Sequence, residues 1–251
     1  MWNKPHVLNA LADLLFLVGL AALLAVWAVW LVRVPSLPIR EVVFAQELQY
    51  VRRLEVEQVL PGALKGNFFS VNLDAVRGAL EKLPWIRRAE VRRIWPARLE
   101  VRVEEHRPAA RWEVEGAPAH NEMVNTFGEV FAANLSPAEA GRLPVLHGPV
   151  GTAPDLLKRY EEWREAFRPL GQRPVAVQLS PRLSWQLRLE NGMAVELGRE
   201  QPKSPVGGRL ARFIEVYGET VGKRDPLPAV VDLRYPNGFA LRGAVGAGKG
   251  K

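Results

Sequence analysis

The sequence contains no cysteine and only four histidines. Without thiols the chain can form neither a disulfide nor a thiolate nucleophile, and a zinc site would lack its most common ligands. The histidines, at positions 6, 106, 120 and 147, include no i,i+3 or i,i+4 pair that could hold a metal on one helix face. No serine lies in a nucleophile-elbow motif. These absences favour neither a metal site nor nucleophilic catalysis.

One glycine-rich segment has the spacing of a phosphate-binding loop but not its other parts. Gly243 to Lys249 reads Gly-x-x-x-x-Gly-Lys, which in a phosphate loop is followed by Ser or Thr at the start of a helix. Gly250 follows here instead. We interpret residues 243–251 as a disordered basic tail.

The charge balance is basic, with 34 Lys and Arg against 27 Asp and Glu and a formal net charge of +7. Such a balance fits nucleic acid, anionic lipid or an acidic protein partner, and it does not choose among them. The 251 residues are enough for one short anchor and two modest domains.

An apolar run stands near the N-terminus. Leu14 to Val32 contains 19 residues without a charge, bracketed by Asp13 and Arg33, with Trp27 and Trp30 near its far end. At about 1.5 Å per residue such a helix just spans a hydrocarbon core of about 30 Å, and indole rings favour the headgroup level. A signal peptide usually has an apolar region of about 7–15 residues followed by small residues, unlike this run. We predict an uncleaved anchor, whose orientation the flanking charges leave open.

The segment after the anchor predicts a small domain with the order strand, helix, helix, strand, strand. The expected elements are Ile39–Phe44, Leu54–Leu60, Ala75–Leu83, Ile86–Arg93 and Arg98–Glu104. Leu99, Val101 and Val103 alternate with charged residues in the last strand, which predicts one buried and one solvent-facing side.

Local signals place the ends of these elements. Pro61-Gly62 is expected to end the first helix, Asp74 to cap the second and Pro84 to end it. Trp95-Pro96-Ala97 predicts the turn between the last two strands, and we interpret Trp85 and Trp95 as packing residues.

From Ala109 onward the pattern is mostly strands with two helices. Asp155 is expected to cap a helix at Leu156–Leu170 that Gly171 ends, and a second helix is expected at Gly207–Val221. Asn191-Gly192 predicts a two-residue hairpin between neighbouring strands. The expected strands are residues 110–114, a broken pair within 124–131, and 143–146, 175–179, 185–189, 193–197, 230–233 and 239–241.

Several short motifs, in order, resemble the POTRA domain of the FtsQ/DivIB family of cell-division proteins. They are Gly66-Asn67-Phe68-Phe69, Val71-Asn72-Leu73, Leu83-Pro84-Trp85-Ile86, Ala89 to Pro96, Leu99 to Val103, Glu104-Glu105 and Arg107 to Trp112. Leu197-Gly198-Arg199 followed by Arg209 to Phe213 resembles the family's late strand-to-helix junction. Val231 to Tyr235 with Gly238 resembles its terminal strands, whereas residues 116–154 match loosely.

The resemblance implies an α+β fold with an N-terminal transmembrane helix, a small βααββ POTRA domain, and a mixed β-sheet domain with two or more helices. The expected boundaries are a cytoplasmic tail at 1–13, the transmembrane helix at 14–34, the POTRA domain at 39–108, the β-domain at 109–242 and a disordered tail at 243–251.

The resemblance also implies a division scaffold without catalytic activity. Members of the family cross the inner membrane once at the division septum, with the N-terminus in the cytoplasm and both domains in the periplasm. They link early and late division proteins by binding FtsB and FtsL, and they help to control septum assembly. FtsK and FtsW/FtsI are further expected partners, together with membrane lipid. No cofactor, metal, small-molecule substrate or nucleic acid is expected.

In this family the FtsB contact is made at the end of the β-domain, where an exposed edge strand accepts a strand from the partner. Arg199, Tyr235, Gly238 and Phe239 are the residues here that the resemblance assigns to this surface. Arg199 would meet a partner carboxylate, and the two aromatic rings would give apolar contact area. Phe239 departs from the family, which often has a small residue near there, and residues 241–243 lack its usual tryptophan. Ordinary sheet packing is the alternative role.

Four arginines in the POTRA strands form a second candidate surface: Arg87, Arg88, Arg92 and Arg93. One interpretation is a solvated face whose arginines pair across strands with Glu100 or Glu104. The other is a docking surface for an acidic partner or for anionic headgroups.

A different class of function is an outer-membrane assembly or secretion factor that uses its POTRA domain as a chaperone. Such proteins usually carry tandem POTRA repeats and a C-terminal barrel with alternating segments of about 10 residues. The sequence has neither. A membrane-bound enzyme is the more remote alternative.

Overall fold

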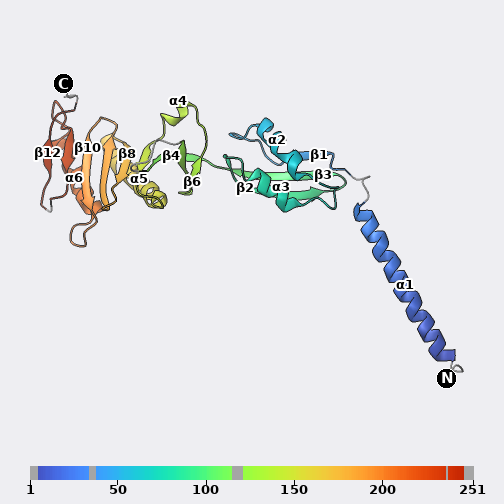
Figure 1. Ribbon diagram of the computed structural model, residues 1–251. Helices are drawn as coiled ribbons and strands as arrows, with labels where there is room; N and C mark the ends of the chain where they lie inside the picture. The colour runs from blue at the N-terminus through green and yellow to red at the C-terminus, as the bar shows by residue number, and fades with distance from the viewer. Residues whose placement is uncertain (1–4, 34–37, 115–120, 236, 246–251) are drawn as a thin grey trace. The chain divides into compact units, whose positions relative to one another are not determined.

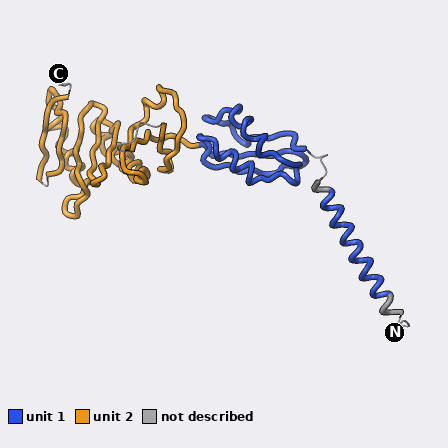
Figure 2. The backbone as a smooth tube through the Cα atoms, viewed as in Figure 1, with its two compact units in different colours: residues 1–105 blue, residues 106–251 orange. Residues whose placement is uncertain are grey.

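The computed structural model describes residues 5–33, 38–114, 121–235 and 237–245. The backbone divides into two compact units, Met1–Glu105 and His106–Lys251 (Figure 2). The predicted domain boundaries stay predictions.

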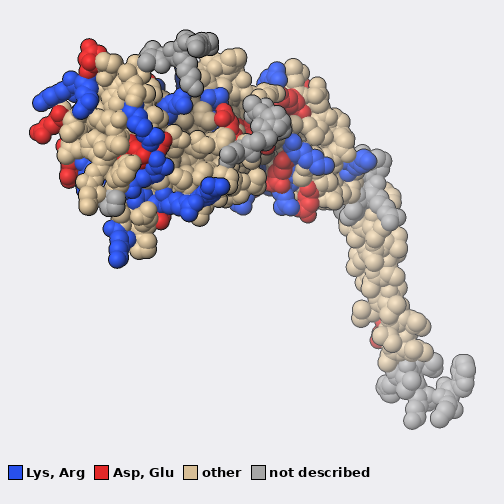
Figure 3. All heavy atoms as spheres, turned by 60° about the vertical axis from the view of Figure 1, so that its left-hand side comes forward, with Lys and Arg blue, Asp and Glu red and all other residues tan. Residues whose placement is uncertain are grey.

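The first unit begins with the helix α1, Pro5–Arg33 (Figure 1). Its segment Asn9–Trp30 is long and apolar enough to cross a membrane, with a mean hydropathy of 2.4 and none of it buried. Figure 3 shows it as a column of uncharged atoms except near its N-terminal end. Twenty-two residues rise about 33 Å, which matches a hydrocarbon core of about 30 Å. The helix therefore fits a single-pass membrane anchor, and it starts earlier than the predicted Leu14.

The rest of the first unit has the predicted βααββ order of a POTRA domain. The strands β1 (Glu41–Phe44), β2 (Ile86–Ile94) and β3 (Arg98–Glu105) form a sheet in the order β1-β3-β2. β3 runs parallel to β1 and antiparallel to β2. The helices α2 (Arg53–Ala63) and α3 (Leu73–Leu80) pack on it through buried side chains. Leu99, Val101 and Val103 are buried, which confirms the predicted alternation in β3.

Three predictions about where the helices of this unit begin and end are wrong. Asn72, and not Asp74, caps α3, since its side chain accepts a hydrogen bond from the Ala75 N–H at 3.1 Å. Asp74 lies in the first turn, and α3 ends at Leu80, before Pro84. Pro61 lies inside α2, where buried Leu60 keeps the last turn on the core and accepts a hydrogen bond from the Leu64 N–H. Capping depends on which oxygen reaches the free N–H groups, and Asn and Asp do this about equally well.

The second unit contains a nine-stranded mixed sheet in the order β12-β11-β10-β9-β8-β7-β4-β5-β6. The strands are β4 (Pro108–Glu113), β5 (Glu122–Asn125), β6 (Val130–Ala132), β7 (Val145–His147), β8 (Pro174–Leu179), β9 (Ser184–Leu189), β10 (Ala194–Arg199), β11 (Val230–Asp232) and β12 (Ala240–Arg242). A hairpin joins β9 and β10 as predicted, but its loop has three residues and not two, because the Leu189 N–H bonds to the Met193 carbonyl across it and Gly192 takes φ +88°. The neighbours β10 and β11 are parallel, and β11 and β12 are antiparallel.

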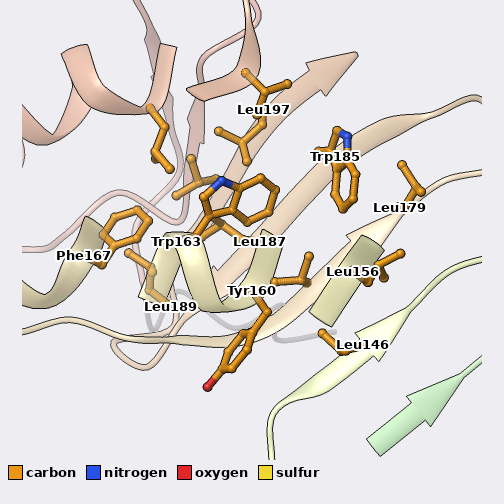
Figure 4. Close-up of a cluster of buried hydrophobic side chains, with 14 of the residues drawn as sticks. Leu146, Leu156, Tyr160, Trp163, Phe167, Leu179, Trp185, Leu187, Leu189 and Leu197 are labelled. Carbon is orange, nitrogen blue, oxygen red and sulfur yellow. The ribbon is translucent and has the colours of Figure 1, made fainter. Parts of the chain in front are cut away.

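Two long helices supply the other half of the core. α5 (Ala153–Phe167) and α6 (Val206–Thr220) bury apolar side chains in the same cluster as the strands. Figure 4 shows Trp163 of α5 among Phe167, Leu187 and Leu189, and its ring meets Trp185 edge-on at 5.4 Å. Since buried and accessible residues alternate along β9, one face of the sheet carries the core and the other faces solvent.

The remaining elements are short. α4 (Pro137–Ala140) follows β6, and the 3-10 helix η1 (Arg168–Leu170) follows α5. Gly171 ends this segment in the left-handed region, as predicted. Asp155 lies in the first turn of α5 and does not cap it, because the helix already begins at Ala153.

Candidate partner-binding edge

The strand β12 lies at one edge of the second sheet and, among the described strands, pairs with β11 alone (Figure 1). Its register places Arg242 opposite Val230 and Ala240 opposite Asp232. An edge strand presents a row of N–H and C=O groups that another strand can pair with. This edge is therefore open to β-augmentation by a second chain.

A network of ion pairs fastens β12 to the two strands beside it. The carboxylate of Asp232, which is 1% exposed, accepts hydrogen bonds from Arg234 at 2.6 and 2.8 Å and from Arg242 at 2.7 Å. Glu196 of β10 lies 3.0 Å from Arg234 and 3.2 Å from Arg242. Carboxylates on β10 and β11 thus share two guanidinium groups, one of which belongs to β12.

The same network shifts the pKa values of Asp232 and Arg234. The hydrogen bond from Arg234 is the main cause that holds the pKa of Asp232 below its ordinary value, with a further contribution from Arg242. In return, Asp232 raises the pKa of Arg234. These groups are therefore ionised at neutral pH, and the edge strand is held by charge as well as by its backbone hydrogen bonds.

A β-bulge lies in β10 immediately before Arg199. The register against β9 shifts between Glu196 and Gly198, and Gly198 has φ +74°, a left-handed conformation that favours glycine. A Cβ atom there would lie 2.8 Å from Cγ of Arg234. Glycine is thus favoured at position 198 both by the backbone conformation and by the nearby Arg234, and Arg199 is exposed beyond the bulge.

A buried arginine fixes the junction that follows. Arg209 of α6 is 3% exposed and donates hydrogen bonds to the carbonyl oxygens of Leu197, Arg199 and Ser204. Burial is the main cause that lowers its pKa, against the charge of Glu200. The backbone of Arg199 is therefore held in place from inside the domain.

Basic side chains gather around a hollow of about 400 Å³ beside this junction. Arginines 182, 199, 209 and 234 line it, together with Ser180, Ser184 and the side chain of Gln201. Arg182 and Arg199 have no ion-pair partner among the described residues. We call this hollow the basic pocket; its chemistry suits a carboxylate or another anion.

The four residues assigned to the partner surface differ in their surroundings. Tyr235 is 55% exposed, in the segment between β11 and β12. Gly238 is exposed, and a Cβ atom there would have open space. Phe239 is partly buried, because its ring packs edge-on against Phe213 at 5.5 Å and lies against the core. Tyr235 and Arg199 are thus accessible to a partner, and Phe239 belongs in large part to the domain itself.

In the POTRA strands two of the four arginines pair with a glutamate across strands, as one of the two interpretations predicts. Arg87 binds Glu104 at 3.0 Å, and Arg92 pairs with Glu100. Arg93 donates to backbone carbonyls, and Arg88 is exposed with no ion-pair partner in the described part of the chain.

Sequence reasoning missed the roles of Glu196, Arg209, Asp232 and Arg242. Each is a charged residue inside an otherwise apolar strand or helix face, and that pattern was the available signal. It could not reveal the pairing, because Glu196 and Arg242 are 46 residues apart. Among the residues described, no group of His, Cys, Asp and Glu could hold a metal.

Comparison with known proteins shows similarity over nearly the whole chain. Residues 37–106 match the model of the POTRA domain, FtsQ-type, and residues 110–234 match that of cell division protein FtsQ/DivIB, C-terminal. "Cell division protein FtsQ" of Burkholderia pseudomallei is 37% identical over 97% of this chain and 95% of its own length. The proteins of the same name from Nitrosospira multiformis and Bordetella pertussis are 36% and 35% identical, over 97% and 96% of this chain and 99% and 92% of their own lengths.

Replacement of Asp232 by Asn should destabilise the protein at neutral pH and cease to matter in acid. A carboxylate with a lowered pKa contributes stability above its unfolded pKa and loses it as the pH falls through the folded value. We expect a loss of about 1–3 kcal/mol at pH 7, which shrinks as the pH falls below the ordinary pKa of a carboxyl group and through the lowered pKa of Asp232. Urea unfolding of the full chain in detergent, from pH 7 to pH 3, measures it. Asp225→Asn, at an exposed position, is the control; equal stability of the two variants at pH 7 would contradict the network.

Proposed function

Because the chain belongs to the FtsQ/DivIB family of cell-division proteins, we propose that it is a scaffold of the divisome. In this proposal it binds FtsB and FtsL in the periplasm, links early to late division proteins, and helps to control septum assembly. The observation that carries the proposal is the open β12 edge beside the exposed Tyr235.

The backbone at this edge supports binding by strand addition. β12 pairs with β11 on one side only, so its other side can form main-chain hydrogen bonds with an extended segment of FtsB. The ion pairs of Arg242 hold β12 in the sheet while it does so. Tyr235 adds the rigid, amphipathic contact area that is typical of residues that dominate binding.

The basic pocket supports a separate charged contact with the partner, because it lies at β9 and β10, inward from the β12 edge in the same sheet. Arg199 and Arg182 lie at its rim without ion-pair partners among the described residues, so a carboxylate of FtsB would not have to displace one of the protein's own. Such a pair would guide the partner to the edge and fix the register of its strand.

The POTRA surface has a smaller part in this proposal. Arg87, Arg92 and Arg93 already bond within the domain, so Arg88 is the arginine of the set that is free to meet FtsK, FtsW/FtsI or another division protein. We propose that the protein acts by binding alone and has no catalytic activity.

We further propose that α1 crosses the inner membrane with its N-terminus in the cytoplasm, and that the protein gathers at the septum. A fluorescent fusion of the full chain should form a band at mid-cell during constriction. Uniform labelling of the envelope throughout the cell cycle would contradict a role in the division complex.

Tyr235→Lys should abolish most of the binding to FtsB and leave the domain folded, because the ring is mostly in solvent. Loss of a central aromatic contact costs about 2 kcal/mol or more, which is roughly a 30-fold rise in Kd. Calorimetric titration with the periplasmic part of FtsB measures it, with Val150→Lys, at another exposed apolar position, as the control. Unchanged affinity in Tyr235→Lys would remove this surface from the proposal. A charge at Phe239 is a poorer test, since it would also disturb the packing on Phe213.

Arg199→Glu should slow association with FtsB by about tenfold at low salt, because reversal of an exposed interface charge acts mainly on encounter. The effect should fade as salt is raised. Stopped-flow association rates at low and high ionic strength test this. Arg142→Glu changes the net charge equally at an exposed site between α4 and β7. If both variants associate at the same rate, the basic pocket does not guide the partner.

A further inference from the structure

Two exposed aromatic rings lie together at one end of the POTRA sheet. Trp95, between β2 and β3, is 67% exposed, and Phe69 is 39% exposed, so the expectation that Trp95 is a packing residue was wrong. The ring of Trp95 lies 6.3 Å from that of Phe69 and 6.0 Å from that of the buried Phe68. Apolar side chains scattered singly over a surface are ordinary, but exposed rings that lie together form an apolar patch. Such patches mark sites that contact proteins, ligands or membranes.

The patch is held firmly to the domain. The guanidinium group of Arg93 donates hydrogen bonds to the carbonyl oxygens of Phe68, Phe69 and Val71, at 2.8, 3.2 and 2.7 Å. One side chain of β2 thereby fixes the loop that carries both phenylalanines. The rings are therefore presented by rigid structure.

This end of the sheet is the one at which the chain arrives from α1. The Arg40 N–H donates to the Ala97 carbonyl at 2.9 Å, and Glu41 pairs in register with Arg98. β3 runs from this end to Glu105, where the unit ends. The seven steps from Arg33, the end of α1, to Arg40 span at most about 25 Å even when fully extended. Arg40, at the same end of the sheet as the patch, thus stays within that distance of the membrane-spanning helix.

The charges around the patch are mainly positive. Arg40, Lys65 and Arg98 are exposed, and none of them has an ion-pair partner within the described ranges. The carboxylates near Arg40 are Glu41 of β1 and Glu57 of α2, and Glu57 is already paired with Arg53. Each basic residue near an anionic leaflet strengthens binding by about fivefold.

We propose that this end of the POTRA domain, formed by Trp95, Phe69, Arg40, Lys65 and Arg98, is a second membrane contact. The two rings rest at the headgroup level of the leaflet to which the domain is tethered, where aromatic rings are favoured. The basic side chains meet the phosphates of anionic lipids. The contact orients the POTRA domain with Glu105 away from the bilayer, and it involves no division partner.

Because the sequence contains no cysteine, a single introduced cysteine can be labelled specifically, and the distance of the label from the bilayer surface can be measured. A fluorophore on Glu41→Cys reports the tethered end of the sheet, and one on Glu47→Cys, exposed beyond the other end of β1, is the matched control. The full chain is reconstituted in phosphatidylglycerol vesicles that carry a headgroup nitroxide. We expect the nitroxide to quench the label at 41 several-fold more than the label at 47. The excess should fall in phosphatidylcholine vesicles and at high salt.

Two sets of variants assign the contact to these residues. Trp95→Ser with Phe69→Ser should remove the excess quenching at 41, while circular dichroism shows that the domain remains folded. Lys65→Gln with Arg98→Gln leaves the rings intact and should weaken the contact about 25-fold. Equal quenching at the two labels in anionic vesicles, or excess quenching unchanged in both double variants, would overturn the proposal. Equal quenching would make the patch a docking face for protein, and the proposed division role would be unaffected.

Discussion

A buried carboxylate, that of Asp232, joins the three strands that end the second sheet. The terminal strand β12 has only three residues, so few backbone hydrogen bonds hold it. Asp232 adds charge-assisted bonds to Arg234 and Arg242, and Glu196 shares both arginines. A buried charge is tolerated only when it is paired and hydrogen-bonded, which is the case here. The network therefore adds to the backbone hydrogen bonds and to the packing of Phe239 in holding β12 at the open edge.

The second unit completes its core without a partner. α5 and α6 cover one face of the sheet, and their apolar side chains join those of the strands in a single cluster. An added strand would therefore extend a finished sheet rather than fill a gap in the core. This arrangement suits the proposed scaffold role, since the domain can be stable before its partners arrive, and the proposed partner surface is limited to the edge and its flanks.

Rigid support of exposed residues recurs in both units. In the second, buried Arg209 holds the backbone around Arg199 through three carbonyl oxygens. In the first, Arg93 binds the loop beneath the aromatic patch in the same way. In each case a guanidinium group satisfies several backbone acceptors at once, which its fork of donors does well. An arginine of this kind looks like surface charge in the sequence and serves as internal support in the fold.

The sequence by itself determined the anchor, the βααββ order, the hairpin at Asn191-Gly192 and the alternation in β3, because these follow from local periodicity and turn chemistry. Only the tertiary structure decided that Asn72 and not Asp74 caps α3, that Phe239 packs on Phe213, and that Trp95 stays in solvent. It also decided which strand ends the sheet and which charges pair there. Those outcomes depend on contacts between residues far apart in the chain, and a local pattern carries no information about which distant side chain will be its neighbour.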